Sequence, residues 1–208
     1  MSDKDPAARR SCCTICLRPK NACICRWVTP VVHQVDVLIL QHPLEMDHAK
    51  NTGRLLHLSL PGSRMLTGET FEEPDLRAAA GRAPQYTVLL YPETLREPAP
   101  AIDMERLSDP VGVRMVVLDA TWRKSRKMLQ LNPFLGQLPR LTLEDMSPSR
   151  YVIRKAPRPG QLSTLEATCT ALGQLEGDAE KYQPLRNAFD GFVAQQLAFS
   201  TRHEFLTL

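Results

Sequence analysis

Three apolar runs stand out along the chain, and each ends in polar residues or proline. They cover residues 35–43, 85–92 and 113–119. Their inner positions are apolar without alternation, which is typical of strands that are buried on both faces of a sheet. We therefore predict three buried β-strands at these places.

The segments between and after these runs carry the apolar spacing and the end signals of helices. We predict helices over residues 47–62, 121–131, 162–175 and 183–200, and two shorter strands over residues 63–71 and 149–154. Strands that alternate with helices indicate an α/β fold, with a mostly parallel sheet and helices on both of its faces. We expect a small cysteine-rich segment at residues 1–30 and a larger domain at residues 31–208.

Ligands of such sheets bind beyond the carboxyl ends of the strands. The predicted strands place His42 and Tyr91 there, each followed by proline, and Asp119 with the three residues after it. These ends carry no G-x-G-x-x-G and no phosphate-loop sequence. The sequence therefore gives no support to an ordinary dinucleotide or nucleoside-triphosphate site.

The stretch VVLDATWRKSRKM joins a strand-end carboxylate to an aromatic residue and a group of cations. On a helix the cations share one broad face, which either meets solvent or contacts phosphate. Asp119 is either the N-cap of that helix or a functional group that takes a proton or binds an ammonium. Trp122 is either a core residue or a stacking platform. The cations are Arg123, Lys124, Arg126 and Lys127.

Charge is distributed unevenly along the chain. The formal net charge is +3, yet ten basic and three acidic side chains lie between positions 114 and 158. Such a window either binds a polyanion, most often nucleic acid, or forms a solvated basic face. No apolar run approaches the roughly 20 residues that span a bilayer, and the first ten residues are polar. We therefore expect a cytoplasmic protein with no membrane partner.

Five of the six cysteines lie between positions 12 and 25. Cys13, Cys16, Cys23 and Cys25 have the spacing C-x2-C-x6-C-x-C, which suits tetrahedral zinc with four thiolate ligands. Two disulfides and an iron–sulfur cluster are the alternatives, and Cys12 competes with Cys13 as a ligand. A closed four-cysteine site has no open coordination position, so we expect Zn²⁺ with a structural role.

The sequence RYVIRKAPRPGQLSTLEA precedes and enters the third predicted helix. Its first part is a basic loop that is placed where it could contact both a nucleic acid and a small ligand. Its second part contains Ser163 and Glu166 at the spacing of a capping box, which by itself is a structural signal. In the same helix, Cys169 is expected to be a small buried apolar residue.

Together these segments resemble the DTW-domain family, which is named for an Asp-x-Thr-Trp signature. Here that signature is Asp119, Ala120, Thr121 and Trp122. The resemblance covers most of the chain. Its other pieces, in order, are CTICLRPKNACIC, LILQHPLE with KNTGRLL, LLYP, LPRLTL and YVIRKAPRPGQLSTLEA.

The resemblance implies a tRNA-uridine aminocarboxypropyltransferase. Such an enzyme moves the 3-amino-3-carboxypropyl group of S-adenosylmethionine to N3 of a uridine in tRNA and releases 5′-methylthioadenosine. It also implies a fold similar to that of the SPOUT RNA-modifying enzymes, whose α/β sheet binds the cofactor and carries a C-terminal trefoil knot.

For the site, the resemblance makes Asp119 the candidate general base or the ligand of the cofactor's ammonium group, with Thr121 and Trp122 beside it. His42 and Asn51 either serve this site or have ordinary structural roles. The cofactor is expected against Leu90, Tyr91, Pro92, Leu118, Gln161, Leu162, Ser163 and Thr164. RNA phosphates are expected against Arg123, Lys124, Arg126, Lys127, Arg154, Lys155 and Arg158.

Two other classes of protein fit parts of the sequence. A SPOUT-like RNA methyltransferase would share the fold and the cofactor but would release S-adenosylhomocysteine. A zinc-containing RNA-binding protein without catalysis would account for the cysteines and the basic window. It would not account for a carboxylate beside Thr-Trp at the end of a strand. The oligomeric state is left open by the sequence.

Overall fold

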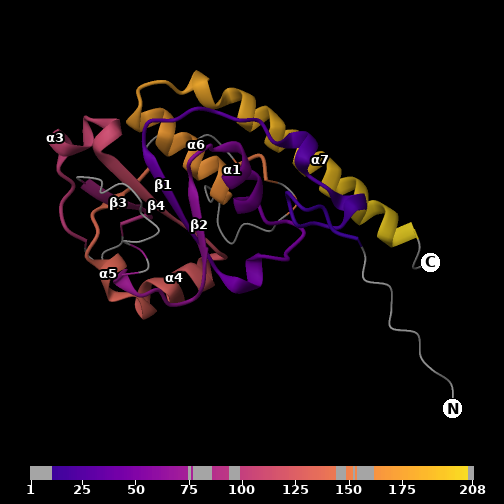
Figure 1. Ribbon diagram of the computed structural model, residues 1–208, viewed down its shortest axis with the longest axis horizontal. Helices are drawn as coiled ribbons and strands as arrows, with labels where there is room; N and C mark the ends of the chain where they lie inside the picture. The colour runs from indigo at the N-terminus through magenta and orange to yellow at the C-terminus, as the bar shows by residue number, and fades with distance from the viewer. Residues whose placement is uncertain are drawn as a thin grey trace, which may run out of the picture.

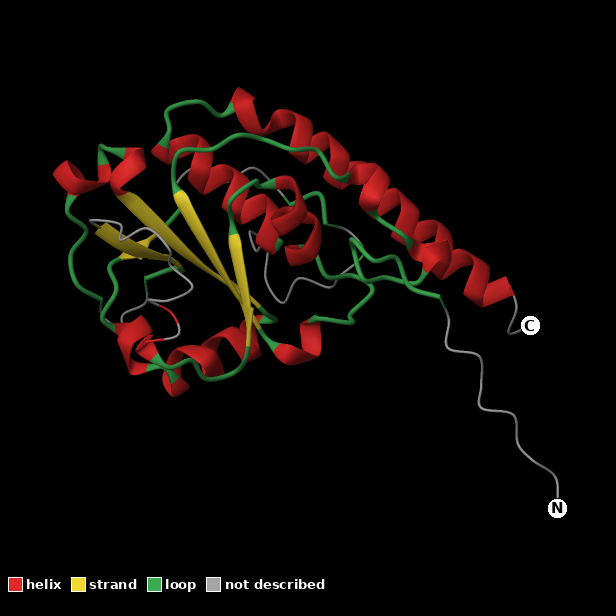
Figure 2. Ribbon diagram, viewed as in Figure 1, coloured by secondary structure: helices red, strands yellow, loops and turns green. Residues whose placement is uncertain are grey.

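Five parallel strands form one sheet in the computed structural model (Figures 1 and 2). The structure describes residues 11–74, 76, 86–93, 99–143, 149–151, 153 and 162–205. The strand order is β2-β1-β4-β3-β5, so β4 is central. The strands are β1 (Asp36–Gln41), β2 (Arg64–Thr67), β3 (Tyr86–Leu90), β4 (Val113–Asp119) and β5 (Arg140–Leu141).

Helices cover both faces of this sheet (Figure 1). One face carries α1 (Gly53–Ser59), α6 (Thr164–Leu175) and α7 (Gln183–Phe205), and the other carries α4 (Trp122–Leu131) and α5 (Pro133–Gly136). The remaining elements are α3 (Met104–Leu107) and the 3₁₀ turns η1 (Lys20–Ala22), η2 (Cys25–Trp27), η3 (Pro43–Glu45), η4 (Pro110–Gly112) and η5 (Glu180–Tyr182). None of the helices in the described ranges has both the length and the apolar composition needed to cross a bilayer.

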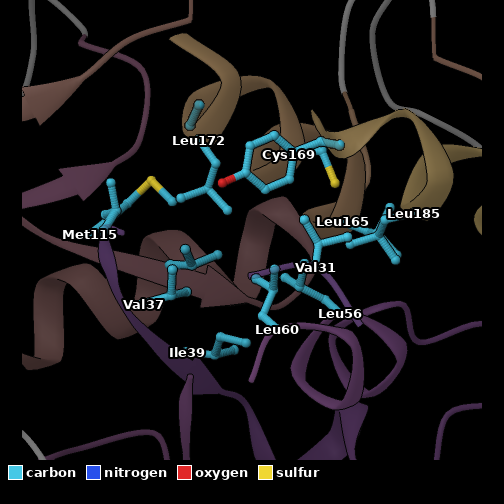
Figure 3. Packing of buried hydrophobic residues seen from close by; sticks show 14 of the residues in the cluster. Val31, Val37, Ile39, Leu56, Leu60, Met115, Leu165, Cys169, Leu172 and Leu185 are labelled. Carbon is cyan, nitrogen blue, oxygen red and sulfur yellow. The ribbon is translucent and has the colours of Figure 1, made fainter. Parts of the chain in front are cut away.

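Each central strand supplies the cores of both faces, because successive side chains point to opposite sides. In β1, Val37 and Ile39 belong to the cluster that also contains Leu56 of α1 and Leu172 of α6 (Figure 3). Leu38, the residue between them, belongs to the second cluster, under α4 and α5. This explains the apolar runs without alternation. Burial of both faces also accounts for Cys169, which is fully buried in the first cluster as predicted.

The predicted α/β class and the three buried strands are confirmed, but the sheet contains one strand that the sequence did not indicate. β5 has only two residues and pairs with β3 through Leu89 and Leu90. The predicted strand at residues 149–154 is wrong where it is described, since Tyr151 is irregular and Ile153 lies in a turn. The trefoil knot stays a prediction, because residues 144–148, 152 and 154–161 lie outside the described part.

The cysteine-rich segment docks on α7, far along the chain (Figure 1). The Trp27 indole nitrogen donates to Gln195 Oε1 at 2.5 Å, and Gln195 Nε2 donates to the Cys23 carbonyl at 3.1 Å. Gly191 faces the Trp27 ring so closely that a Cβ there would lie closer than 3.0 Å to it. The segment is therefore packed against the larger domain, and the boundary at residue 30 stays a prediction.

Candidate active site and metal centre

The carboxyl ends of β1 and β4 meet at Gln41 and Asp119. These two residues end their strands and are partners in the parallel register. Side chains at the same level of neighbouring strands point to the same side of the sheet, and Gln41 Nε2 donates to Asp119 Oδ2 at 2.9 Å. The strand-end carboxylate is therefore fixed from the adjacent strand.

Two further donors complete the surroundings of Asp119. Asn51 Nδ2 donates to Oδ2 at 2.6 Å, and the Thr164 hydroxyl donates to Oδ1 at 2.8 Å. Asp119 is only 2% exposed, and Gly53, at the start of α1, lies directly against the carboxylate. One carboxylate thus joins β1, β4, the loop before α1 and the first turn of α6.

Burial raises the pKa of Asp119, because the charged form loses its hydration. The hydrogen bonds from Gln41, Asn51 and Thr164 act in the opposite direction, since they favour the carboxylate, and the negative charge of Glu45 adds to the upward shift. A nearby cation would stabilise the ionised form.

Asp119 is not the N-cap of α4, so the first of the two roles that the sequence allowed for this residue is excluded. Thr121 holds this position, with its hydroxyl accepting from the Lys124 backbone N–H at 3.4 Å and its carbonyl accepting from the Ser125 N–H at 2.7 Å. Asp119 still belongs to β4. The signature therefore combines a strand-end carboxylate with a helix cap two residues later.

Trp122 begins α4 and is neither buried in the core nor fully exposed, at 36% exposure. Its ring lies against that of Tyr91, which follows β3, with centroids 5.9 Å apart. The guanidinium of Arg140, from β5, lies 5.2 Å from the centre of the Tyr91 ring. The two rings, with Arg140 beside them, form what we call the aromatic shelf next to the strand ends.

Two of the predicted RNA-binding cations make ion pairs within the protein. Lys124 Nζ lies 3.0 Å from a carboxylate oxygen of Glu45, which is 1% exposed, and Lys127 Nζ lies 3.0 Å from Glu69. A phosphate contact of either lysine would compete with its carboxylate. Arg123 and Arg126 are exposed on the same helix.

His42 is buried beside these pairs and has a defined tautomer. The Leu44 N–H donates to Nδ1 at 3.1 Å, so Nε2 carries the proton and donates to Glu69 at 2.6 Å. Lys127 and His42 together lower the pKa of Glu69. In this arrangement both ring nitrogens of His42 are engaged, which favours a structural role.

The rest of the basic window is less concentrated than its sequence indicates. Arg114 pairs with Asp36 at 2.7 Å at the opposite end of the sheet, and Arg150 pairs with Asp190 at 2.8 Å on α7. Three predicted phosphate contacts and one cofactor contact lie outside the described residues, namely Arg154, Lys155, Arg158 and Gln161.

The first turn of α6 brings part of the predicted cofactor site to Asp119. Ser163 and Glu166 form the predicted capping box, so the Ser163 hydroxyl is used by the helix. Thr164 is the residue of this turn whose side chain reaches Asp119. Leu162 precedes the cap, Leu90 and Pro92 flank Tyr91, and the Leu118 side chain is buried under α4.

Four cysteine sulfurs gather in the N-terminal segment. The Sγ atoms of Cys13, Cys16, Cys23 and Cys25 all lie within 4.8 Å of one another. Cys12 is exposed and pairs through its backbone with Pro19. The fold thus selects Cys13 over Cys12 for the cluster.

The chemistry of this donor set fits a cation. Backbone N–H groups of Cys16 and Ile15 lower the pKa of Cys13 to about 6, whereas burial and neighbouring thiols raise the pKa of Cys25 to about 12. A cation among the four sulfurs would allow all of them to ionise at this separation, and Zn²⁺ prefers such a set of thiolate ligands.

Sequence reasoning missed three members of the site, Gln41, Gly53 and Glu45. Gln41 is the polar residue that ends an apolar run, as Asp119 does, and this shared position was the available signal. Gly53 and Glu45 reach the site only through tertiary packing, which no local pattern shows.

A parallel α/β sheet with an Asp-x-Thr-Trp stretch ending its central strand, joined to a four-cysteine segment, defines the class of this protein. The chain matches the DTW domain over residues 10–197 and belongs to that family.

Curated relatives agree with this assignment. The chain is 33% identical over 188 residues to tRNA-uridine aminocarboxypropyltransferase 2 of Drosophila melanogaster, covering 87% of this chain and 73% of the relative. It is 28% identical over 208 residues to tRNA-uridine aminocarboxypropyltransferase A of Arabidopsis thaliana, covering 87% and 78%. It is 33% identical over 178 residues to tRNA-uridine aminocarboxypropyltransferase 2 of Mus musculus, covering 82% of this chain and 58% of the longer relative. No solved structure gives a significant match.

Proposed function

We propose that this protein transfers the 3-amino-3-carboxypropyl group of S-adenosylmethionine to N3 of a uridine in tRNA. The observation that carries the proposal is the similarity of most of the chain to relatives with this named activity, with the signature Asp119 at the centre of the strand-end site. Ligands of parallel sheets bind at such ends.

The reaction is a displacement at carbon. Uridine N3 loses its proton and attacks the γ-carbon of the methionyl group, the carbon–sulfur bond breaks, and its electron pair stays on sulfur. The positively charged sulfonium thereby becomes the neutral thioether of 5′-methylthioadenosine. A sulfonium has three carbons open to attack, so the outcome depends on which carbon the site holds in line with N3.

Asp119 has two possible roles in this reaction, and its surroundings favour binding the cofactor's ammonium group. A carboxylate offers about four acceptor positions, and three are used by Gln41, Asn51 and Thr164. The fourth, on Oδ1, would accept one N–H of the ammonium, which would also stabilise the buried negative charge. The alternative is that Oδ1 takes the N3 proton as a general base.

The aromatic shelf suits the nucleobase. A uridine must leave its stack to reach a protein site, and exposed aromatic rings stabilise unstacked bases. Trp122 presents its ring beside the strand ends and is held by Tyr91. Arg123 and Arg126, exposed on the same helix, would then contact RNA phosphates and set the position of the tRNA.

Differential labelling of the cofactor tests this proposal. The protein is incubated with unmodified tRNA transcript and S-adenosylmethionine labelled either in the methionyl carboxyl carbon or in the methyl carbon. We expect the carboxyl label alone to enter a uridine nucleoside, with an equal amount of 5′-methylthioadenosine by mass spectrometry. Asp119→Ala should abolish the transfer while tRNA affinity changes less than threefold.

Other results would point to the competing classes. Methyl label in the nucleoside, with S-adenosylhomocysteine as by-product, would make the protein an RNA methyltransferase. tRNA binding by folded protein without either label in the RNA would favour a binding protein without catalysis.

A further inference from the structure

The short segment that carries Asn51 is held by side chains from elsewhere in the chain. Arg18 donates to two of its carbonyls, with Nη1 2.6 Å from the Ala49 oxygen and Nη2 2.9 Å from the Asn51 oxygen. The Tyr151 hydroxyl donates to the carbonyl between them, that of Lys50. Three consecutive carbonyls are therefore bound by two side chains.

Holding this backbone matters because Asn51 is a hub. Its side-chain nitrogen donates to Asp119 at 2.6 Å, while its side-chain oxygen accepts from the N–H of Arg54, in the first turn of α1, at 3.1 Å. A shift of the Asn51 backbone would move both contacts. The position of the Asp119 carboxylate is thus coupled to the carbonyls that Arg18 binds.

Arg18 is in turn positioned by the cysteine cluster. It follows Cys16 by two residues, and its carbonyl accepts from the Cys13 N–H at 2.8 Å, which closes the turn. Leu17 in that turn has φ 60°, a left-handed conformation that costs a non-glycine residue about 1–2 kcal/mol. A turn strained in this way needs its neighbours fixed, and metal ligation of Cys13 and Cys16 would do so. The guanidinium also lies 5.3 Å from the centre of the Phe192 ring on α7.

We propose that Arg18 is a positioning residue through which the four-cysteine segment holds Asn51, and hence Asp119, in place. The metal site then acts on the active site as well as on the fold of its own segment. The contacts alone carry this inference, and only its kinetic consequence rests on the proposed function. Arg54 adds a parallel link, since its Nη2 donates to the Ile15 carbonyl at 2.9 Å.

Hydrogen–deuterium exchange of the full chain tests this coupling. Arg18→Met removes both donated bonds, and Arg26→Met, an exposed arginine of the same segment that stacks on Trp27, is the matched control. With zinc bound, we expect exchange across residues 48–54 to be at least tenfold faster in Arg18→Met than in the wild type or Arg26→Met. Removing zinc from the wild type by chelation should accelerate exchange across residues 48–54 to the same extent. In Arg18→Met, where exchange is already fast, chelation should accelerate it little further.

The kinetic readout separates positioning from general loss of structure. A displacement of about 1 Å at a reacting group can lower the rate 10²-fold, so kcat should fall about 10- to 100-fold in Arg18→Met while KM for tRNA stays within threefold. Arg18→Lys can reach only one carbonyl at a time, so it should recover part of the exchange protection and part of kcat. It replaces Arg18→Met in both experiments if the methionine variant does not fold. Unchanged exchange at residues 48–54 in a zinc-loaded Arg18 variant would overturn the proposal. Absence of transferase activity in the wild type would overturn the proposed function but would leave the exchange result decisive for Arg18.

Discussion

Gly53 lies against the carboxylate of Asp119 with no space for a side chain. A Cβ on Gly53 would lie closer than 3.0 Å to Oδ1, Oδ2 and Cγ of Asp119. Glycine loses more conformational freedom on folding than any other residue, so its presence here needs a reason. The close approach of the α1 backbone to the signature residue explains it.

The first prediction follows from this contact. Gly53→Ala should force Asp119 out of its hydrogen bonds or push α1 outward, which lowers the free energy of unfolding by about 1–3 kcal/mol and abolishes transfer. Gly136→Ala, where an added Cβ meets no atom within 4 Å, is the control and should unfold as the wild type does. Equal denaturation midpoints for the two variants would contradict the described geometry.

A second prediction concerns the pH dependence of stability. Because the pKa of Asp119 is raised in the folded state, the folded protein keeps this proton at pH values where the unfolded chain has lost it. Its contribution to stability is therefore fully present below the ordinary value near 3.8 and is lost as pH rises through the raised pKa. Asp119→Asn cannot ionise, so its Tm relative to the wild type should increase as pH rises from about 4 towards neutrality.

The asparagine variant tests this cleanly because its amide can occupy the same space, with the Thr164 hydroxyl accepting instead of donating. Asp109→Asn, at an exposed cap of η4, controls for the loss of one carboxylate. A Tm difference that stays constant with pH would mean that Asp119 does not change its protonation in this range.

A third prediction distinguishes the adjacent cysteines. Cys13→Ser should lose the metal, because it removes one of four sulfurs that share one centre. Cys12→Ser should retain one zinc per chain, because Cys12 is exposed and outside the cluster. Metal analysis of tag-free protein checks both variants, and retention of zinc by Cys13→Ser together with its loss from Cys12→Ser would exchange their roles.

A fourth prediction separates the cations of α4 by their partners. Lys124→Met should lower the free energy of unfolding by about 3 kcal/mol, because the buried carboxylate of Glu45 loses an ammonium partner. Arg123→Met should leave stability unchanged, weaken tRNA binding, and reduce the slope of log K against log salt by about one. Urea denaturation and binding at several salt concentrations give both quantities. If Lys124→Met changed only the salt slope, Lys124 would belong to the RNA surface.

The sequence was sufficient for the strands that form the middle of the sheet. The runs ending at Gln41, Leu90 and Asp119 are apolar at successive positions because helices bury both faces, and that is a local signal. β5 gave no such signal, because two residues are too few to show a pattern of apolar positions. The run around Tyr151 had the right composition for a strand, but the Tyr151 side chain instead binds the Lys50 carbonyl and packs on Phe189.

In the site, too, the sequence predicted the roles that depend on neighbouring residues but not the contacts between residues far apart in the chain. Thr121 as a helix cap follows from its neighbours, and Asp119 follows from its place at a strand end. The partners of Lys124 and Lys127 are 79 and 58 residues away, so the sequence could not show that these two lysines form ion pairs within the protein. The hydrogen bonds from Arg18 to the carbonyls of Ala49 and Asn51 could not be predicted for the same reason.

The contact between Trp27 and Gln195 spans 168 residues, and this separation has a consequence for the newly synthesised protein. The four cysteines lie within 13 residues of one another, so they can come together early in synthesis. The helix on which it packs follows only after roughly ten to thirty seconds of translation, at about 5–20 residues per second. During that interval the Trp27 ring and the stacking surface of Arg18 have no α7 to cover them. A chaperone that shields aromatic side chains would therefore meet this chain at its N-terminal segment first, and should leave it once the residues up to Gln195 are free to fold.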